Sequence, residues 1–385
     1  MTPAYDVICI GAGPTGLACA IEVKRAGLRP LVIDKGVLCN SLYHYPVNMV
    51  FFTTPELLEI GDLPFVSAAE KPNRVEALKY YRKCVEHYDL DLRLGETVTR
   101  VEGGDGDFRV HTRASDQPAP HTQVYSSRKL IVATGYYDLP NRLSVPGEDL
   151  PHVSHYYTEP HPYWRQDVVV VGGRNSAAEA ALDLYRAGAR VTLVHRSAQL
   201  GPTIKYWVRP DIENRIKAGQ ITALFETRVV RIEPGFVHVA SAGDSGSVAT
   251  PDQVVERQKG VSSRESHGDQ ELSRVDKVTP LLAHKKLPAV QVFVLTGYHP
   301  DFDFLRQLGV TLDPLTNKPA LDPRTHESNV PGLYLAGVVI GGNHTSEIFI
   351  ENGRFHGKQI IAALTGAPVP AADPVDVGVR HGFIS

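Results

Sequence analysis

The sequence predicts an α/β fold with two doubly wound domains, each built on a parallel sheet. Two observations carry this prediction. Over residues 5–34 a strand, a glycine-rich turn, a helix and a second strand follow one another, and the same order returns over residues 167–194. Each copy is completed by a buried strand followed by a loop that contains a glycine, at residues 128–135 and 291–297. Parallel strands joined through a helix need a sheet that is covered on both faces.

The first copy opens with the apolar strand Tyr5–Ile10, which the turn Gly11–Gly16 closes. The apolar spacing of the next residues predicts a helix to Gly27, and a second strand, Leu28–Ile33, ends at Asp34.

Gly11, Gly13 and Gly16 have the spacing G-x-G-x-x-G. The first glycine permits the sharp turn, the second lets the backbone approach a pyrophosphate, and the third lets the helix pack on the strand. Asp34 stands where a carboxylate can accept hydrogen bonds from ribose hydroxyls. The first copy therefore predicts a dinucleotide site.

The second copy consists of the strand Asp167–Val171, a turn over residues 172–177, a helix to about Gly188 and the strand Arg190–Val194. It predicts a second dinucleotide site in the same chain, so hydride transfer between two cofactors is expected.

The second turn departs from the first. Arg174 stands in the place of the middle glycine, and Ala177 replaces the last, a small residue that the motif accepts. The next strand ends in His195 and Arg196 instead of an acid. A guanidinium pairs with a phosphate that a carboxylate would repel, so NADPH is favoured over NADH. Lys205 either assists Arg196 or is a surface lysine.

The expected domains are residues 1–150, residues 151–298, and residues 299–385, which return to the first domain. The aromatic and proline-rich stretch Tyr156–Trp164 and the segment Tyr298–Pro300 are the expected crossings between the domains.

Two segments stay outside this scheme. Residues 241–277 are polar and poor in aromatic side chains, so an exposed insertion is expected there. The tail after Pro368 is either frayed or docked.

The composition excludes several classes of protein. The chain has 385 residues and a formal net charge of −3, which leaves no broad basic face for nucleic acid. Its four cysteines form neither a C-x-x-C nor a zinc-ligand pattern, so no metal site is expected. No apolar run approaches a membrane span, and we expect a soluble cytoplasmic protein that forms a homo-oligomer.

Several blocks in combination resemble thioredoxin-reductase-like flavoproteins, most closely the bacillithiol disulfide reductase branch. These blocks are Ile10–Gly16, Ile60–Phe65, Ala133–Tyr137, Gly172–Ala177, Gly297–Asp301, Ala336–Val338 and Ile348–Gly357.

The resemblance implies an enzyme with a split FAD domain, in which NADPH reduces FAD and a low-molecular-weight thiol disulfide, such as bacillithiol disulfide, is the acceptor. The residues implied for FAD are Gly11, Gly13, Pro14, Thr15, Gly16, Asp34, Lys35, Thr134, Gly135, Gly337 and Ile348. Those implied for NADPH are Gly172, Gly173, Arg174, Asn175, Ser176, Ala177, His195, Arg196 and Lys205. A helix beginning near Glu347 to Ile348 would direct its N-terminus at the pyrimidine oxygen of the flavin.

The chain departs from its relatives at three points. It lacks the redox C-x-x-C of thioredoxin reductases, and it has Thr15 where the bacillithiol disulfide reductase branch was linked to a cysteine. A threonine cannot perform thiol–disulfide exchange. Val338 replaces an aspartate that binds the ribityl chain in many relatives, a loss that the closest branch shares.

If another cysteine acts, Cys39 is the candidate, because it follows the second strand and is expected in a loop. Cys9 and Cys19 are expected in the core, and Cys84 on an amphipathic helix. The catalytic residue is otherwise unknown.

The aromatic stretches Tyr43–Pro46 and His152–Tyr157 are expected either to edge the flavin or to pack at domain junctions.

Three alternatives remain open. A ferredoxin or flavodoxin NADP reductase would share the architecture and lack the dithiol, and His381 and Phe383 of the tail would then cover the flavin. A flavin monooxygenase is less favoured because, of the F-x-G-x-x-x-H fingerprint, only His155 is present. A non-catalytic redox sensor that binds both cofactors is the third alternative.

Overall fold

The computed structural model describes residues 4–115, 122–241 and 285–370. The chain divides into two compact units. The first contains residues 1–141, 156–159 and 296–385, and the second contains residues 142–155 and 160–295.

These bounds differ from the expected domain ranges. Residues 142–150 belong to the second unit, and residues 296–298 to the first. Of the stretch Tyr156–Trp164, expected to cross between domains, only residues 156–159 belong to the first unit. Residues 242–277 of the expected insertion and the tail after residue 370 lie outside the described residues.

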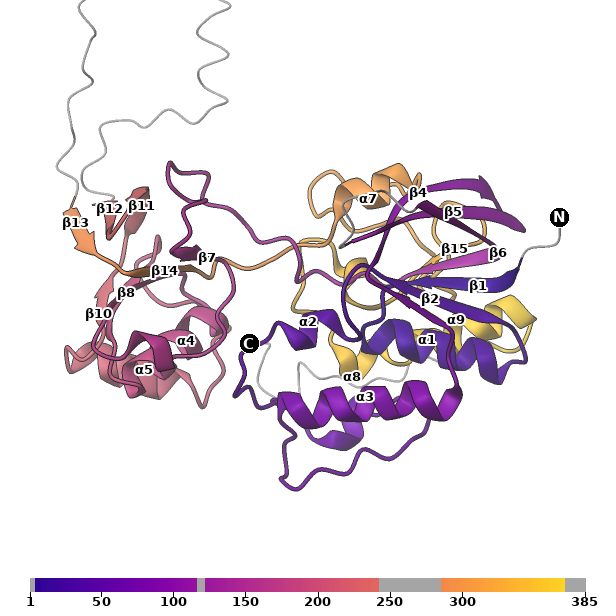
Figure 1. Ribbon diagram of the computed structural model, residues 1–385, viewed down its shortest axis with the longest axis horizontal. Helices are drawn as coiled ribbons and strands as arrows, with labels where there is room; N and C mark the ends of the chain where they lie inside the picture. Colours follow the sequence, from indigo (N-terminus) through magenta and orange to yellow (C-terminus); the bar gives the residue numbers. More distant parts are fainter. Residues whose placement is uncertain (1–3, 116–121, 242–284, 371–385) are drawn as a thin grey trace, which may run out of the picture. The chain divides into compact units, whose positions relative to one another are not determined.

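The first unit is built on a mixed seven-stranded sheet (Figure 1). Its strands run in the order β3 (Leu92–Leu94), β2 (Pro30–Asp34), β1 (Tyr5–Ile10), β6 (Thr122–Val132), β5 (Asp107–Ala114) and β4 (Glu96–Gly104), and β15 (Leu333–Leu335) also pairs with β6. β1 pairs in parallel with β2 and β6, whereas β5 pairs with both of its neighbours in antiparallel fashion.

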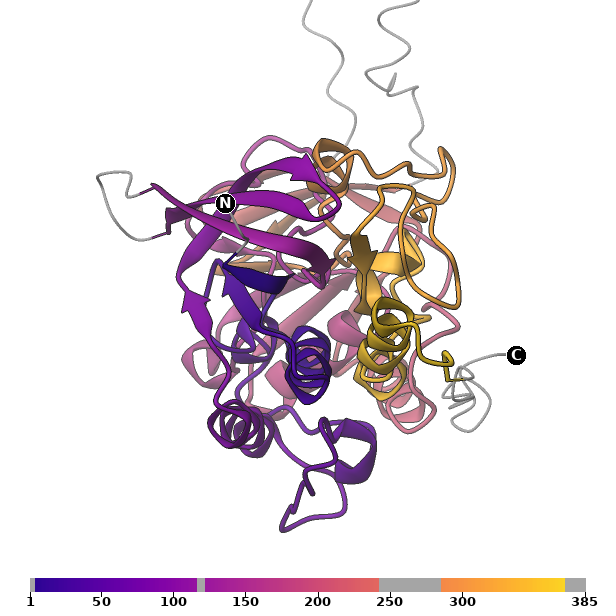
Figure 2. The same cartoon turned by 90° about the vertical axis from the view of Figure 1, so that its right-hand side faces the viewer.

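Helices α1 (Pro14–Arg25), α9 (His356–Thr365) and α3 (Arg74–Tyr88) contribute to the core on one face of this sheet. Figure 2 shows indigo α1 beside yellow α9 beneath the strands, and the two helices are in contact. Strand β1 alternates between two cores: Val7 and Cys9 face these helices, and Ile8 and Ile10 face the opposite core. That second core includes residues of β5 and of α7 (Phe302–Gln307).

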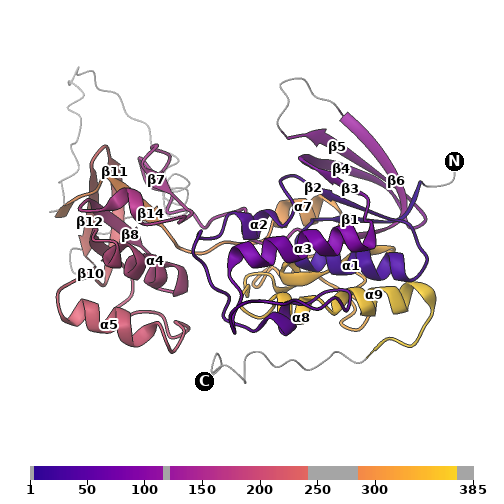
Figure 3. The same cartoon turned by 60° about the horizontal axis from the view of Figure 1, so that its bottom comes forward.

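Four short helices complete the described part of the first unit. They are α2 (Asn40–Tyr43), α8 (Ile350–Gly353), and the 3-10 helices η1 (Pro55–Leu58) and η4 (Gly337–Gly341), with the sheet hairpin β4–β5 at one side. Figure 3 shows α8 near α1 and α9, and contacts join α8 to α1, η1 and η4.

The second unit repeats the parallel arrangement with β10 (Thr222–Leu224), β9 (Arg190–Val194), β8 (Asp167–Val171), β14 (Gln291–Val294) and β7 (Val153–Ser154), in that order. Its helices are α4 (Asn175–Arg186), α5 (Arg209–Lys217) and the short η2 (His161–Tyr163). An antiparallel sheet of β11 (Thr227–Glu233), β12 (Phe236–Ser241) and β13 (Lys285–Pro288) shares an apolar core with β8 and β14.

The structure confirms the predicted fold class, two Rossmann-like units, and the predicted β-α-β order in each. The differences are at the ends of elements. β2 starts at Pro30, two residues after its expected start. None of the described helices has the length and apolar character needed to cross a bilayer.

Candidate functional site

The first glycine turn is closed by contacts in which only glycine fits. Gly11 has φ of +115°, and a Cβ on it would lie well inside 3.0 Å of the Ala133 carbonyl oxygen. A Cβ on Gly16 would meet the Gly11 carbonyl oxygen in the same way. The amide of Gly11 donates to Ile33 O at 2.8 Å, and that of Ala133 donates to Ile10 O at 2.8 Å. The turn is therefore pressed against the end of β6, whose continuation carries Thr134 and Gly135.

The start of α1 is open to a ligand. Gly13 is its N-cap in an extended conformation, with Pro14 in the first turn, and neither a capping side chain nor an acidic residue of that turn satisfies the free amides. A Cβ on Gly13 would have no atom within 4 Å. Unpartnered amides beside open space at a helix N-terminus favour an anion.

Asp34 lies at the edge of this turn. Its Oδ2 accepts from Ala12 N at 2.7 Å and its Oδ1 from Gly36 N at 2.8 Å. Burial raises the pKa of Asp34, while the two amides and Lys35 act to lower it. Lys35 also pairs with Asp138 at 3.0 Å. Each carboxylate oxygen keeps acceptor capacity for a hydroxyl of a ribose.

Three segments that are far apart in the sequence meet at Thr15. A Cβ placed on Gly337, which has φ of +78°, would lie 3.1 Å from Thr15 Cγ2. A Cβ on Gly353 would lie 2.9 Å from Thr15 Oγ1. The first turn, the start of η4 and the end of α8 therefore approach one another closely, which places Gly337 beside the first glycine turn.

A buried histidine pair lies beside Gly337. Gly337 N donates to His356 Nδ1 at 3.0 Å, and the His356 ring stacks on His326 with centroids 4.2 Å apart. His326 Nε2 pairs with Gln359 Oε1 at 2.7 Å. Burial lowers the pKa of His356 to about 3 and also lowers that of His326. Sequence reasoning named neither histidine, although His356 stands in one of the resemblance blocks.

The expected helix near Glu347 begins later than predicted, at Ile350. The side chain of Asn352 caps this start: its Oδ1 accepts from Phe349 N at 2.8 Å, and its Nδ2 donates to Glu347 O at 3.1 Å. Ile348 lies just before this helix. Glu351 on α8 is only 2% exposed, and burial raises its pKa to about 7. Sequence reasoning did not single it out.

The second glycine turn has the same closing contact as the first. Gly172 has φ of +149°, and a Cβ on it would lie well inside 3.0 Å of the Leu295 carbonyl oxygen and 2.8 Å from the Ala177 Cβ. Gly173 lies under the ring of His195, which leaves no room for a side chain. As in α1, the first turn of α4, which includes Ser176, has neither a side-chain cap nor an acid.

Positive charge gathers beside this turn. Arg174 and Arg196 are exposed, and burial, helped by the charges of Arg196 and Arg174, lowers the pKa of His195. Neither guanidinium has an ion-pair partner within 4.0 Å among the residues that the structure describes.

Asn175 and Lys205 have structural contacts here. Asn175 Oδ1 accepts from Lys205 N at 2.9 Å, and its Nδ2 donates to Thr203 O at 2.9 Å. Lys205 Nζ pairs with Glu179 at 2.7 Å. In this structure the two residues fix the loop after β9 to the start of α4.

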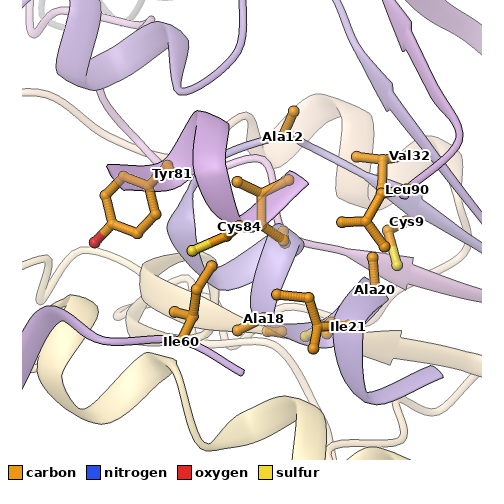
Figure 4. Close-up of a cluster of buried hydrophobic side chains, with 14 of the residues drawn as sticks. Cys9, Ala12, Ala18, Ala20, Ile21, Val32, Ile60, Tyr81, Cys84 and Leu90 are labelled. Carbon is orange, nitrogen blue, oxygen red and sulfur yellow. The ribbon is translucent and has the colours of Figure 1, made fainter. Parts of the chain in front are cut away.

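All four cysteines are free and buried. Cys39, expected in an accessible loop, is 1% exposed because its amide donates to Ala12 O at 3.0 Å and draws it beneath the first turn. Figure 4 shows Cys9 and Cys84 among apolar side chains. Burial raises the pKa of each thiol, so the thiolate that disulfide exchange needs is disfavoured at all four positions.

The tyrosines at the crossings of the first unit pack on one another. The rings of Tyr137 and Tyr298 have centroids 4.4 Å apart, and Tyr45 meets Tyr137 edge-on at 4.8 Å. Tyr156 OH donates to Tyr137 O at 3.1 Å. In the second unit, His152 Nε2 pairs with Glu233 O at 3.1 Å. These side chains make packing contacts within their own unit.

Comparisons with known proteins identify the family. The model of the pyridine nucleotide-disulphide oxidoreductase family matches residues 8–277 and 271–337. The bacilliredoxin reductase Bdr of Bacillus subtilis is 40% identical over 358 residues, which cover 93% of this chain and 96% of that protein. The structure of the bacillithiol disulfide reductase Bdr from Bacillus cereus superposes with a TM-score of 0.81 at 37% identity, covering 94% of this chain and 99% of the other. A ferredoxin–NADP reductase of Gluconobacter oxydans is 27% identical over 343 residues, 87% of this chain and 84% of that protein.

This chain belongs to the pyridine nucleotide-disulphide oxidoreductase family. The assignment confirms the predicted class, a flavoprotein oxidoreductase similar to thioredoxin reductases and bacillithiol disulfide reductases, and the predicted cofactors, FAD and NADPH.

The buried histidine pair predicts acid sensitivity. The folded pKa of His356, about 3, lies below its unfolded value near 6.5, so its stabilisation is complete above pH ~6.5 and declines as the pH falls toward 3. We expect the free energy of unfolding to fall by up to ~1.4 kcal/mol per pH unit below pH ~6 through this group. Urea unfolding between pH 7 and 4 measures this slope.

The control is His356→Asn, which keeps an acceptor for Gly337 N but cannot titrate. The free energy of unfolding of this variant should fall less steeply with falling pH than that of the wild type. Equal slopes would contradict the assignment of this acid sensitivity to His356.

Proposed function

We propose that this protein is an NADPH-dependent FAD oxidoreductase that reduces a low-molecular-weight thiol disulfide, such as bacillithiol disulfide, without a C-x-x-C dithiol. The observation that carries the proposal is a pair of glycine turns, each with free amides at a helix start, on a chain 40% identical to a bacilliredoxin reductase. The absence of C-x-x-C is a property of the sequence itself.

The first turn suits FAD. The pyrophosphate would occupy the space beside Gly13, where the amides at the start of α1 donate to it. Asp34 would accept from the adenosine ribose, and Gly337 would lie along the ribityl chain. When bound, FAD supplies the two-electron chemistry between a nicotinamide and a disulfide.

The second turn suits NADPH. Its pyrophosphate would meet the start of α4, and Arg196, with Arg174 and His195 nearby, would hold the 2′-phosphate. A carboxylate that would favour NADH does not follow β9, which ends at Val194 before His195 and Arg196.

The buried thiols bear on the disulfide step. All four cysteines lie in the interior of the first unit with raised thiol pKa values. Electrons would therefore reach the substrate disulfide without a mixed disulfide on the protein. The unpaired state of the four cysteines also supports a cytoplasmic location, and the homo-oligomer stays a prediction.

A ferredoxin or flavodoxin NADP reductase is the second candidate. It is supported by the similarity to the Gluconobacter oxydans ferredoxin–NADP reductase and by the missing dithiol. A redox sensor would bind both cofactors without turnover.

Anaerobic mixing with NADPH, followed by a panel of acceptors, separates these functions. We expect rapid bleaching of the flavin absorbance and steady turnover with bacillithiol disulfide. Turnover with ferredoxin or flavodoxin alone would favour the second candidate, and an unbleached flavin would contradict both and indicate a sensor.

The two glycines of the first turn separate cofactor binding from folding. A Cβ on Gly13 meets open space, so Gly13→Ala should leave unfolding of the apoprotein within ~0.5 kcal/mol of the wild type and still weaken FAD binding at least ~10-fold. In Gly16→Ala the added Cβ would overlap the backbone oxygen of Gly11, so the free energy of unfolding should fall by roughly 2–4 kcal/mol. Urea unfolding and FAD titration by fluorescence measure the two effects, and unchanged FAD affinity in Gly13→Ala would argue against this site.

Arg196→Glu tests the 2′-phosphate assignment. Loss of a charged hydrogen bond of ~1.5–3 kcal/mol and its replacement by repulsion should raise the KM for NADPH ~10- to 100-fold or more and leave that for NADH nearly unchanged. Arg228→Glu, an exposed change on β11 of the same unit, is the control. A retained preference for NADPH in Arg196→Glu would contradict the assignment.

A further inference from the structure

A buried carboxyl lies beside the glycine segments of the first unit. Glu351 is on α8, which contacts α1, η1 and η4. Two residues further along, Gly353 approaches Thr15 of the first turn and lies near Gly337. The proposed function gives Glu351 no role.

The positive charge of Arg354 acts to lower the pKa of this carboxyl, but the two groups form no ion pair. Among the described residues, none forms an ion pair with Glu351 within 4.0 Å. Arg354 follows α8, and its Nη1 donates to the carbonyl oxygens of Glu56 at 2.7 Å and Glu59 at 2.9 Å.

Two tyrosines lie within electrostatic range of Glu351. Tyr45 precedes η1 in the chain, and Tyr81 on α3 donates its hydroxyl to Leu58 O at 3.0 Å. Glu56 and Glu59 are the acids of the η1 segment, and η4 has only glycine, valine and isoleucine. Burial without an ion pair therefore disfavours ionisation of Glu351 and raises its pKa to about 7, where both protonation states are accessible near neutral pH.

Such a carboxyl responds to charge in its surroundings. Added negative charge nearby raises the pKa of a carboxyl further, so the carboxyl binds a proton. Reduction of a flavin adds electrons to the site, and oxidation removes them again. A carboxyl that titrates near neutrality can follow this cycle under physiological conditions.

We propose that Glu351 is the proton store of the candidate FAD site, taking up a proton when reducing equivalents enter and giving it up when they pass to the disulfide. This inference rests on the proposed function for its second half. NADPH delivers a hydride, which is two electrons and one proton. Cleavage of the S–S bond to two thiols needs two electrons and two protons, so the second proton comes from the Glu351 carboxyl, and water supplied it during the first half.

The test follows the bound flavin without NADPH or disulfide. The holoprotein is reduced at an electrode, and the flavin midpoint potential is measured between pH 5.5 and 8.5. The wild type should show a change of slope near pH 7 because uptake by Glu351 is linked to reduction. Glu351→Gln should give a constant slope through this range. Glu86→Gln, the same change at an exposed carboxyl of α3, should retain the wild-type curve.

Infrared difference spectra of reduced minus oxidised holoprotein give a second readout. A C=O band of a protonated carboxyl should appear in the wild type and vanish in Glu351→Gln. If Glu351→Gln does not bind FAD, Glu351→Asp keeps a carboxyl at the position and should keep both the slope change and the band. A slope change that persists in Glu351→Gln, or no carboxyl band in the wild type, overturns the proposal.

Failure of the two proposals can be distinguished. Missing turnover with bacillithiol disulfide would overturn the proposed function and leave the electrode result untouched. A wild-type curve without a slope change would overturn the proton store even in a protein that turns over the disulfide.

Discussion

The structure depends on a close contact between the first glycine of a glycine turn and a backbone carbonyl oxygen, and each unit contains this contact. At Gly11 and at Gly172 the chain leaves a strand with positive φ, and a side chain there would collide with the carbonyl oxygen of the residue that follows the neighbouring strand, Ala133 or Leu295. Only glycine tolerates both conditions. The contact brings the helix start to the carboxyl edge of the sheet, where its free amides face outward. Each site is thus a consequence of how two parallel strands end.

The two turns share their backbone contacts but differ in the side chains that lie beside them. At the first, a buried aspartate is held by two backbone amides, and open space lies beside Gly13. At the second, Gly173 is covered by the ring of His195, and the exposed Arg174 and Arg196 lie within electrostatic range of that ring. A carboxylate receives hydroxyl donors, and guanidinium groups receive a phosphate. The same local fold thereby presents two chemically different surfaces, as the proposed FAD and NADPH sites would require.

The segment from η4 to α9 concentrates buried titratable groups beside the first turn. His356 accepts from the amide of Gly337 and stacks on His326, and burial lowers the pKa of both rings, while Glu351 lacks a partner within ion-pair distance among the described residues. Keeping such groups in the interior is unfavourable unless they are hydrogen-bonded or protonated. Glu351 and His356 thus place titratable groups next to the backbone that would approach FAD, in a protein whose cysteines are all buried.

The sequence by itself determined the two β-α-β units, the places of both glycine turns, Asp34 and Arg196, because these are local patterns in which strand, turn and helix signals follow one another within about thirty residues. Tertiary structure alone decided that Cys39 is buried beneath the turn, that α8 begins at Ile350, and that Glu351 and His356 lie inside. Burial of a single side chain depends on which distant segments pack over it, and a short helix of mixed composition has no periodicity that could reveal its inner face.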